Sequence, residues 1–429
     1  MIDICPVFQS TQVSTFFEVT NVPIHCNLIW ESQAESIQAP RGDIHLGFCR
    51  NCGHIFNLVF NPDLMKYDQD YENSLHFSPR FQQYAESLSR ELIQRHNLSK
   101  KQIIEIGCGK GDFLQLLCNQ GQNRGIGFDP SYEHHRNKNT NSPIEFIEDF
   151  YSSKYSNYSF DFICCRHVLE HLQFSSEFLN EIRMNINENF NIAVYFEVPN
   201  VNFILCNDGI WDIIYEHCSY FSTGSLAAVF HSSGFKVHSC RDAFSGQFLS
   251  IEASIKDNST LKTDNTWLDV NQISNDVEKF SGIYQEKISN WSEQLFQIRD
   301  KNLKAVIWGA GSKGVTFLNT LKINKEIEYV VDLNPNKQGN YIAGTGQKFV
   351  SPEFLSEFNP DSVIVMNPIY AKEIQINELV YIVEEIAGIR LNRKYKLDAP
   401  KGVNGRKGDN TKIQKVFGMG TKYKALCQV

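Results

Sequence analysis

No run of apolar residues in this 429-residue chain approaches the roughly 20 that a membrane-spanning helix needs. The first residues contain no basic segment followed by an apolar one, so the sequence offers no secretion signal. Excess positive charge is also missing, because a net charge of −8 gives no basic field for nucleic acid or an anionic membrane. These absences favour a cytoplasmic protein without a nucleic-acid or membrane partner.

A disulfide framework is also absent. The chain contains 12 cysteines, but at this length and without a secretion signal they indicate metal binding or burial as reduced thiols. A hydrophobic content of 42% is ordinary for a globular protein, and the length favours roughly three domains.

The order of apolar runs predicts the fold class. From 102 to about 255, short apolar runs alternate with helical patterns, which is typical of an α/β domain with a mostly parallel sheet. Two strands close together, 235–240 and 248–255, suggest an antiparallel edge. A helix is expected from Pro79 to Asn97, whereas residues 1–75 are rich in loops. A smaller α/β domain begins near 304, and the basic residues 391–429 predict a disordered tail.

A glycine-rich turn follows the first strand of the α/β region. Glu105 precedes Gly107, Gly109 and Gly111, and a second strand ends in Asp129. A strand-to-helix turn at the carboxyl edge of a parallel sheet is a ligand site, where glycine permits a close approach. A carboxylate ahead of the turn would repel the pyrophosphate of a dinucleotide, whereas it would attract a ligand with an amine. S-adenosylmethionine has an amino group, a sulfonium and a ribose that Asp129 can meet.

The next strands extend this interpretation. Asp149 ends a third strand, where it can meet an adenine amino group, and a fourth strand leads into the sequence RHVLEHL. Together these residues resemble class I S-adenosylmethionine-dependent methyltransferases. The resemblance implies that the cofactor, S-adenosyl-L-methionine, is held by Glu105, Gly107, Gly109, Gly111, Asp129 and Asp149.

Further motifs narrow the resemblance. CRNCGH (49–54), DYENSLHF (70–77), RHVLEH (166–171), FEVPN (196–200), YEHCSYF (215–221) and GAGSKG (309–314) follow in this order. The order is similar to that of bacterial C-methyltransferases that act on nucleotide-linked 4-keto-deoxysugars. The resemblance covers roughly 1–390.

That resemblance implies a Rossmann-like class I methyltransferase core with an N-terminal zinc-ribbon-like module and a smaller C-terminal α/β domain. The expected segments are the N-terminal module 1–75, the core 76–256, a helical connector 257–300, the C-terminal domain 301–390 and the tail 391–429.

The same resemblance suggests catalytic roles. His217, preceded by Glu216, matches a general base, and Tyr71 matches a tyrosine that reaches the sugar. Either His167 or His171 matches a histidine near the substrate, and His167 lies closer to the strand end. Histidine suits the removal of a proton beside a ketone, because its pKa is near the operating pH and the enolate can be stabilised by nearby donors. Another tyrosine expected two residues before Glu216 is replaced by Ile214.

Three other patterns leave alternatives open. HVLEH (167–171) matches a zinc-peptidase pattern, but its place after a strand of a methyltransferase-like sheet disfavours a protease. Cys5, Cys49 and Cys52 predict structural zinc with Cys26 or His25 as fourth ligand, because Phe8 stands at the usual position. The alternative is buried reduced thiols.

Gly309, Gly311 and Gly314, followed by Asp332, form a dinucleotide fingerprint. The domain is too short for a second mononucleotide half, so NAD is disfavoured, although Lys313 at the helix start can meet a substrate phosphate. For the whole chain, the alternatives to a C-methyltransferase are an O- or N-methyltransferase and a non-catalytic S-adenosylmethionine-binding protein.

Overall fold

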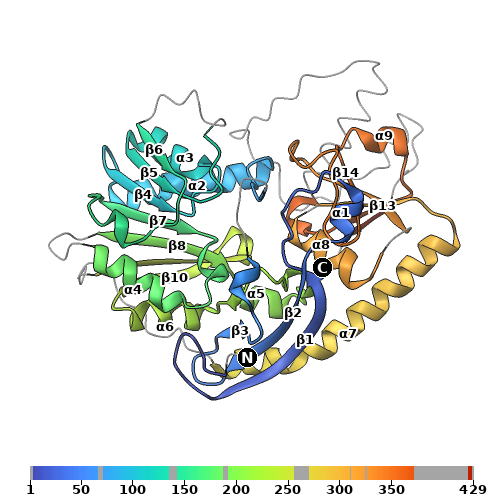
Figure 1. Ribbon diagram of the computed structural model, residues 1–429, viewed down its shortest axis with the longest axis horizontal. Coiled ribbons are helices and arrows are strands. Elements are labelled where there is room, and N and C mark those ends of the chain that lie inside the picture. The colour runs from blue at the N-terminus through green and yellow to red at the C-terminus, as the bar shows by residue number, and fades with distance from the viewer. Residues whose placement is uncertain are drawn as a thin grey trace, which may run out of the picture.

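The computed structural model describes residues 3–65, 71–134, 143–186, 192–255, 270–309, 311–323, 326–371 and 424–427. These residues form three sheets that are covered or connected by helices (Figure 1). None of the described helices is long and apolar enough to cross a membrane.

The central sheet is mostly parallel, as expected. Its strand order is β10-β11-β8-β7-β4-β5-β6, and only β11 runs antiparallel to both of its neighbours, β8 and β10. The predicted antiparallel edge is therefore confirmed. The strands are β4 (Gln102–Ile106), β5 (Arg124–Phe128), β6 (Ile144–Ile147), β7 (Phe162–Arg166), β8 (Ala193–Pro199), β10 (Lys236–Ala243) and β11 (Phe248–Ser254).

Helices cover both faces of this sheet because its buried strands alternate apolar side chains between the two faces. On one face, Ile103 and Phe162 pack in a cluster with α2 (Pro79–His96) and α3 (Asp112–Gly121). On the other face, Ile104 and Ile163 pack in a cluster with α4 (Ser175–Asn185) and α6 (Thr223–Ser232). The short helix α5 (Val201–Cys206) follows β8. The predicted helix at 79–97 is confirmed, and Ser78 caps its start by accepting from the backbone N–H of Phe81.

The N-terminal residues contain more strand than the sequence suggested. The long strands β1 (Val13–Pro23) and β2 (Arg41–Cys49) pair antiparallel, and β3 (Ile55–Asn57) and β9 (Ser219–Tyr220) complete the sheet. The pairing of β1 with β2 shifts register twice, so its side chains do not alternate regularly and the pattern was missed. The short helix α1 (Gln33–Ile37) precedes β2. Because β9 belongs to the core sequence, this sheet joins the N-terminal residues to the core.

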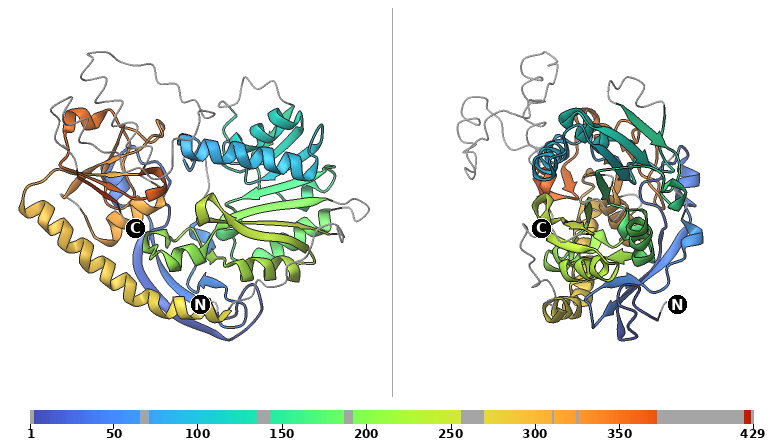
Figure 2. Two further views of the ribbon diagram at one scale, coloured as in Figure 1. Left: turned by 180° about the vertical axis from the view of Figure 1, so that it is seen from behind. Right: turned by 90° about the vertical axis from the view of Figure 1, so that its left-hand side faces the viewer.

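The C-terminal domain is a parallel sheet. The helix α7 (Val270–Asp300) leads into it, running from beside β1 to the C-terminal sheet (Figure 2). The strand order is β14-β13-β12-β15-β16. The elements are β12 (Ala305–Trp308), α8 (Ser312–Thr320), β13 (Ile327–Val331), β14 (Lys348–Val350), α9 (Phe354–Phe358), β15 (Ser362–Val365) and β16 (Lys424–Cys427). Of the predicted basic tail, only β16 lies within the described residues.

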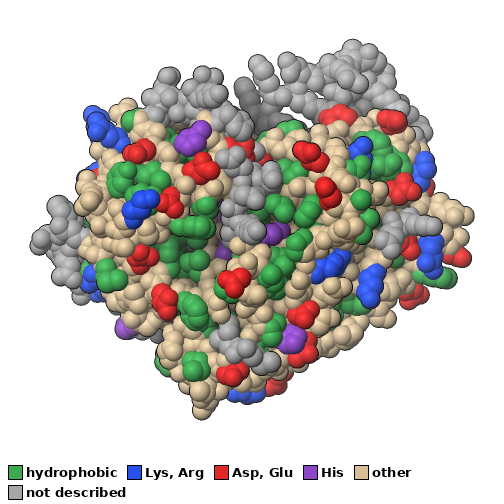
Figure 3. Space-filling model, in the orientation of Figure 1, with side chains coloured by type: hydrophobic (Ala, Val, Ile, Leu, Met, Phe, Trp, Pro, Cys, Tyr) green, Lys and Arg blue, Asp and Glu red, His purple; other side chains and the backbone are tan. Residues whose placement is uncertain are grey.

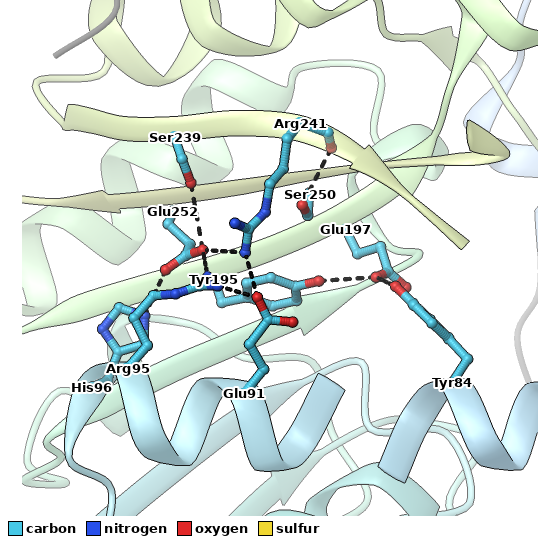
Figure 4. Close-up of polar contacts among 10 residues, drawn as sticks. All are labelled: Tyr84, Glu91, Arg95, His96, Tyr195, Glu197, Ser239, Arg241, Ser250 and Glu252. Carbon is cyan, nitrogen blue, oxygen red and sulfur yellow. Dashed lines mark hydrogen bonds and ion pairs between the residues drawn. The ribbon is translucent and has the colours of Figure 1, made fainter. Parts of the chain in front are cut away.

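A polar network fastens α2 to the antiparallel edge of the central sheet (Figure 4). The carboxylate of Glu252 on β11 accepts hydrogen bonds from Arg95, His96 (2.7 Å) and Arg241 (3.1 Å), and its side chain is only 6% exposed. Burial opposes ionisation of Glu252, but the hydrogen bond from His96 and the charge of Arg95 lower its pKa. The network therefore holds an ionised carboxylate under α2.

We expect Glu252→Gln to lower the free energy of unfolding in urea by about 2 kcal/mol, because it removes the buried anion that Arg95, His96 and Arg241 share. The matched control is Glu91→Gln. Glu91 bonds to the same two arginines but is 50% exposed, so a loss below about 0.5 kcal/mol is expected. The contribution of Glu252 is present above the unfolded-state pKa of 4.5 and is lost as the pH falls through the lower folded-state pKa. Equal losses in the two variants would contradict this role for Glu252.

Candidate active site

The glycine-rich turn lies between β4 and α3. Gly107, Gly109 and Gly111 have φ values of 68°, 53° and 84°, a region that other residues rarely adopt. A Cβ on Gly107 would lie 2.1 Å from Val168 Cγ2, whereas a Cβ on Gly109 would meet nothing within 4 Å. Gly107 thus permits close packing under the turn, and Gly109 faces open space.

Two carboxylates flank this turn. Glu105 is 2% exposed, and its Oε2 has no hydrogen-bond partner among the described residues. Burial raises the pKa of Glu105 to about 8. Asp129 follows β5 and accepts hydrogen bonds from Gly109 N (2.8 Å) through one oxygen and from Ser131 N (2.8 Å) through the other. Asp129 therefore fixes the turn, while Glu105 has an unused acceptor.

Asp149 lies after β6 at the same edge of the sheet. It accepts from Lys154 Nζ (2.8 Å) and the Tyr155 hydroxyl (2.6 Å), and these hydrogen bonds lower its pKa to about 2. The next residue, Phe150, exposes 64% of its surface. An acceptor and an apolar ring thus stand together beyond the turn.

The carboxylate of Glu197, in β8, organises the other side of the edge. It is fully buried and accepts from Arg166 (2.9 Å), His167 Nε2 (3.1 Å), and the hydroxyls of Tyr195 (2.9 Å) and Tyr84 (Figure 4 shows the two tyrosines). Burial opposes its ionisation, but Arg166 holds its pKa below the usual range. These contacts join β7, β8 and α2 around one charge.

His167 lies between two carboxylates. Its Nε2 contacts Glu197, and its Nδ1 lies 3.6 Å from Glu170 Oε1. Burial disfavours the charged ring, but the two carboxylates raise the pKa of His167 to about 9. His167 also has a positive φ of 56°, so this contact is made from a strained backbone. With both ring nitrogens directed at protein carboxylates, His167 is a charged positioning residue.

His217 lies beside His171 instead, with ring centroids 5.0 Å apart. Burial and the neighbouring His171 lower the pKa of His217 to about 4, so its ring is neutral at neutral pH. The buried Nδ1 of His217 has no hydrogen-bond partner among the described residues. His171 Nδ1 donates to the carbonyl oxygen of Glu216 (2.9 Å). The structure thus pairs His217 with His171 and not with His167, the residue that its place in the sequence favoured.

Glu216 and Tyr71 both lie next to His25, which follows β1. Glu216 Oε1 lies 3.3 Å from His25 Nδ1, and its Oε2 accepts from the backbone N–H of Cys26 (3.3 Å). The ring of His25 in turn lies 6.1 Å from that of Tyr71, which is 5% exposed. Glu216 thus anchors the N-terminal residues to the core.

Three cysteines cluster at the other end of the N-terminal sheet. Cys5, Cys49 and Cys52 are buried with their sulfur atoms within 4.8 Å of one another. Hydrogen bonds from the other two thiols lower the pKa of Cys49, so it ionises first. Cys26 and His25 contact Glu216 and are not in this cluster, so neither is placed as the fourth ligand considered above. Phe8 is 53% exposed and offers no ligand atom.

A cleft of about 940 Å³ opens where the three parts of the chain meet. The face in Figure 3 has acidic and basic side chains interspersed, with histidines visible in the hollow between the core and the C-terminal domain. The cleft lining includes Glu31, Glu72, Glu86, Asp112 and Glu133, and Lys110, whose Nζ lies 2.6 Å from Glu133 Oε1. The cleft is therefore acidic.

Comparisons with known proteins agree with this geometry. A methyltransferase-domain model matches residues 77–240, and a model of the C-methyltransferase C-terminal domain matches residues 268–386. The C-methyltransferase NovU of Streptomyces niveus is 25% identical over 301 residues, covering 65% of this chain and 69% of NovU.

The protein is a class I S-adenosylmethionine-dependent methyltransferase. Both C-methyltransferase matches support transfer of the methyl group to carbon. Among solved structures, magnesium protoporphyrin IX methyltransferase of Synechocystis PCC 6803 is 14% identical with a TM-score of 0.32, covering 41% of this chain and 84% of its own. An S-adenosylmethionine-dependent methyltransferase of Aquifex aeolicus is 13% identical with a TM-score of 0.31, and the match covers 39% of this chain and 89% of the Aquifex chain.

The second glycine motif of the methyltransferase contacts its own core. Lys313 Nζ lies 2.5 Å from Asp212 Oδ2, and Trp211 packs on Phe317 of α8 with ring centroids 5.0 Å apart. A Cβ on Gly314 would lie 2.5 Å from the carbonyl oxygen of Gly309, so this glycine serves close packing. Lys313 is thus already engaged with a carboxylate of the core.

The sequence analysis missed the roles of Glu197, Glu170 and Arg166. For Glu197 and Arg166 the signal was a charged residue inside or at the end of a buried apolar strand, as in YFEV and FICCR. Such a charge is retained only where partners compensate it.

S-adenosylmethionine fits the unused acceptor of Glu105, because its amino end is cationic. We expect binding at pH 7 to release about nine tenths of a proton, since Glu105 with a pKa of about 8 must ionise to meet that cation. Calorimetry in buffers of different ionisation enthalpy measures this release. Glu105→Gln should abolish it and weaken affinity roughly tenfold or more.

The matched control is Glu145→Gln, on the exposed edge strand β6. It should leave both the proton release and the affinity unchanged. Unaltered proton release in Glu105→Gln would show that another group meets the cofactor.

Proposed function

We propose that the methyltransferase methylates a carbon beside a ketone, in a nucleotide-linked keto-deoxysugar, with His217 as the general base. The observation that carries the proposal is the neutral His217 ring, whose buried Nδ1 has no partner among the described residues. A transfer to oxygen or nitrogen does not need a base against a carbon acid. NovU, named a C-methyltransferase, supports the choice of carbon.

His217 removes the proton from the carbon next to the ketone. Because its ring is neutral well below pH 7, nearly every molecule carries the base in its active form. Tyr71 is the hydroxyl donor that we assign to the enolate oxygen. His167 and Glu216 act through their neighbours: His167 orients Glu170, and Glu216 orients His171 and His25.

The cofactor, when bound, supplies the electrophilic methyl group. We assign its amino end to Glu105, its ribose to Asp129 and its adenine to Asp149, with Gly107, Gly109 and Gly111 allowing close approach. Phe150 adds an exposed ring beside Asp149 on which a base can stack. The open space at Gly109 supports this arrangement.

Each part of the chain has a task in this proposal. The N-terminal module (1–75) supplies Tyr71, and the core (76–256) supplies the cofactor site and His217. The connector (257–300) leads into the C-terminal domain (301–390), which completes the cleft. Asn336 lines the cleft and donates to Glu72 (3.0 Å), and Lys337 donates to Asn27 (3.1 Å) beside Tyr71.

Zinc is part of the same proposal. Three buried thiols within 4.8 Å fit a zinc ion that cross-links residue 5 to residues 49 and 52. The ion's task there is structural, because it would hold the N-terminal strands that carry His25 towards the site.

The acidic cleft restricts how the acceptor lies. A diphosphate placed against Glu31, Glu72, Glu86 and Asp112 would be repelled, so we place the phosphates outside this cleft. An acceptor with an amine or several hydroxyls on its sugar ring suits the cleft better than one with a carboxylate.

The test is deuterium exchange beside the ketone. A panel of nucleotide-linked 4-keto-sugars is incubated in D₂O with the protein and either S-adenosylmethionine or S-adenosylhomocysteine, and the products are weighed by mass spectrometry. We expect deuterium uptake with S-adenosylhomocysteine and methyl gain with S-adenosylmethionine. His217→Asn should lower both at least a hundredfold, whereas His231→Asn, on the exposed end of α6, should change neither.

With S-adenosylhomocysteine at saturation, so that the ionisation of Glu105 does not limit its binding, the exchange rate should also be nearly independent of pH between about 5.5 and 8, because the pKa of His217 is about 4. Methyl gain with no loss in His217→Asn would overturn the base assignment. No exchange and no methyl gain with any sugar would overturn the choice of acceptor.

A further inference from the structure

The HVLEH segment (167–171) does not form the helix that a zinc peptidase would need. Leu169–His171 is a single 3-10 turn, and His167 has a positive φ. The ring of His167 therefore turns to Glu197, while His171 faces His217 from the other motif. The two histidines of the segment thus face different partners.

Glu170, His171 and His217 nevertheless converge. One ligand atom from each lies within 4.8 Å of the others. Glu170 is 1% exposed, and neither of its carboxylate oxygens has a hydrogen-bond partner among the described residues. A buried carboxylate without donors is costly, so a group that fits the gap is favoured.

The surroundings orient the two rings. His171 Nδ1 donates to the carbonyl oxygen of Glu216, which fixes the direction of its ring. A backbone carbonyl on the far nitrogen is the usual support of a metal-bound histidine. On His217 it is Nδ1 that is buried without a partner. The third neighbour, His167, lies 3.6 Å from Glu170 Oε1, which leaves Oε2 for another cation.

We propose that Glu170, His171 and His217 bind a divalent transition-metal ion, and that this ion competes with the general-base role of His217. Two imidazoles and one carboxylate are the donor set of zinc and cobalt, with a fourth position left open. Magnesium and calcium prefer oxygen alone. Tetrahedral zinc holds its ligand atoms roughly 3.3 Å apart, so small side-chain rotations close the site.

The competition follows from the chemistry of imidazole. A nitrogen lone pair that binds a metal is not available to a proton, and a cation beside the ring disfavours a second positive charge. Bound metal therefore blocks proton removal at His217. This consequence rests on the proposed function, whereas metal binding does not.

The binding test uses the full chain, stripped of metal by a chelator and titrated with Co²⁺. We expect two equivalents to bind, one with the thiolate-to-cobalt absorption of the cysteine cluster and one without it. Glu170→Gln should lose only the second. The matched control is Glu148→Gln. Glu148 lies 3.9 Å from His134 and belongs to no metal-ligand group among the described residues, so this variant should keep both equivalents.

If Glu170→Gln does not fold by circular dichroism, His171→Asn takes its place with the same expected loss. The site would be overturned if the cobalt equivalent that lacks thiolate absorption were bound equally by the wild type and by a folded ligand variant. The site would also be overturned if the wild type bound one equivalent of cobalt in total and that equivalent showed thiolate absorption.

A second arm tests the competition through deuterium exchange into the keto-sugar. Zn²⁺ should inhibit the wild type, and Glu170→Gln should need at least ten times more Zn²⁺ for the same inhibition. Equal inhibition of both would overturn the competition. If no sugar exchanges, the proposed function fails, but the cobalt result still decides the metal site.

Discussion

The ion pair of Glu197 with Arg166 and His167 is the interaction on which the rest of the active site depends. Glu197 is fully buried, so its charge persists only because Arg166 and His167 compensate it. His167 thereby stays protonated and keeps the neighbouring Glu170 ionised, as shown by the lowered pKa of that residue despite its burial. The buried anion Glu197 thus sets the charges of His167 and Glu170, which lie between it and His217.

The parts of the fold that local pattern determines were predicted from sequence. The core strands are short buried runs, so β4, β5, β7 and β8 were recognisable by their apolar composition alone. The glycine turn was recognisable because three left-handed residues require glycine there. The N-terminal strands were missed because their register shifts interrupt alternation, and β9, with two residues, is set by its partner strand.

The candidate site was harder to predict because its decisive contacts join distant residues. His167 was favoured over His171 by its place next to a strand end, but the ring directions depend on Glu197, 30 residues away. Cys26 was grouped with the other cysteines by residue type, but in the structure its backbone N–H donates to Glu216. The first contact follows from the pairing of β7 with β8, and the second from the packing of the N-terminal residues on the core. No local pattern encodes either.

Charge is divided between two histidines of the site: His167 is charged and His217 is neutral. An NMR titration of the histidine ring nitrogens measures this division, with the signals assigned from His167→Gln and His217→Asn. We expect His167 to be protonated at pH 7, with a pKa of about 9, and His217 to take up a proton only near pH 4. A neutral His167 at pH 7, or a His217 that titrates near 6.5, would contradict this division.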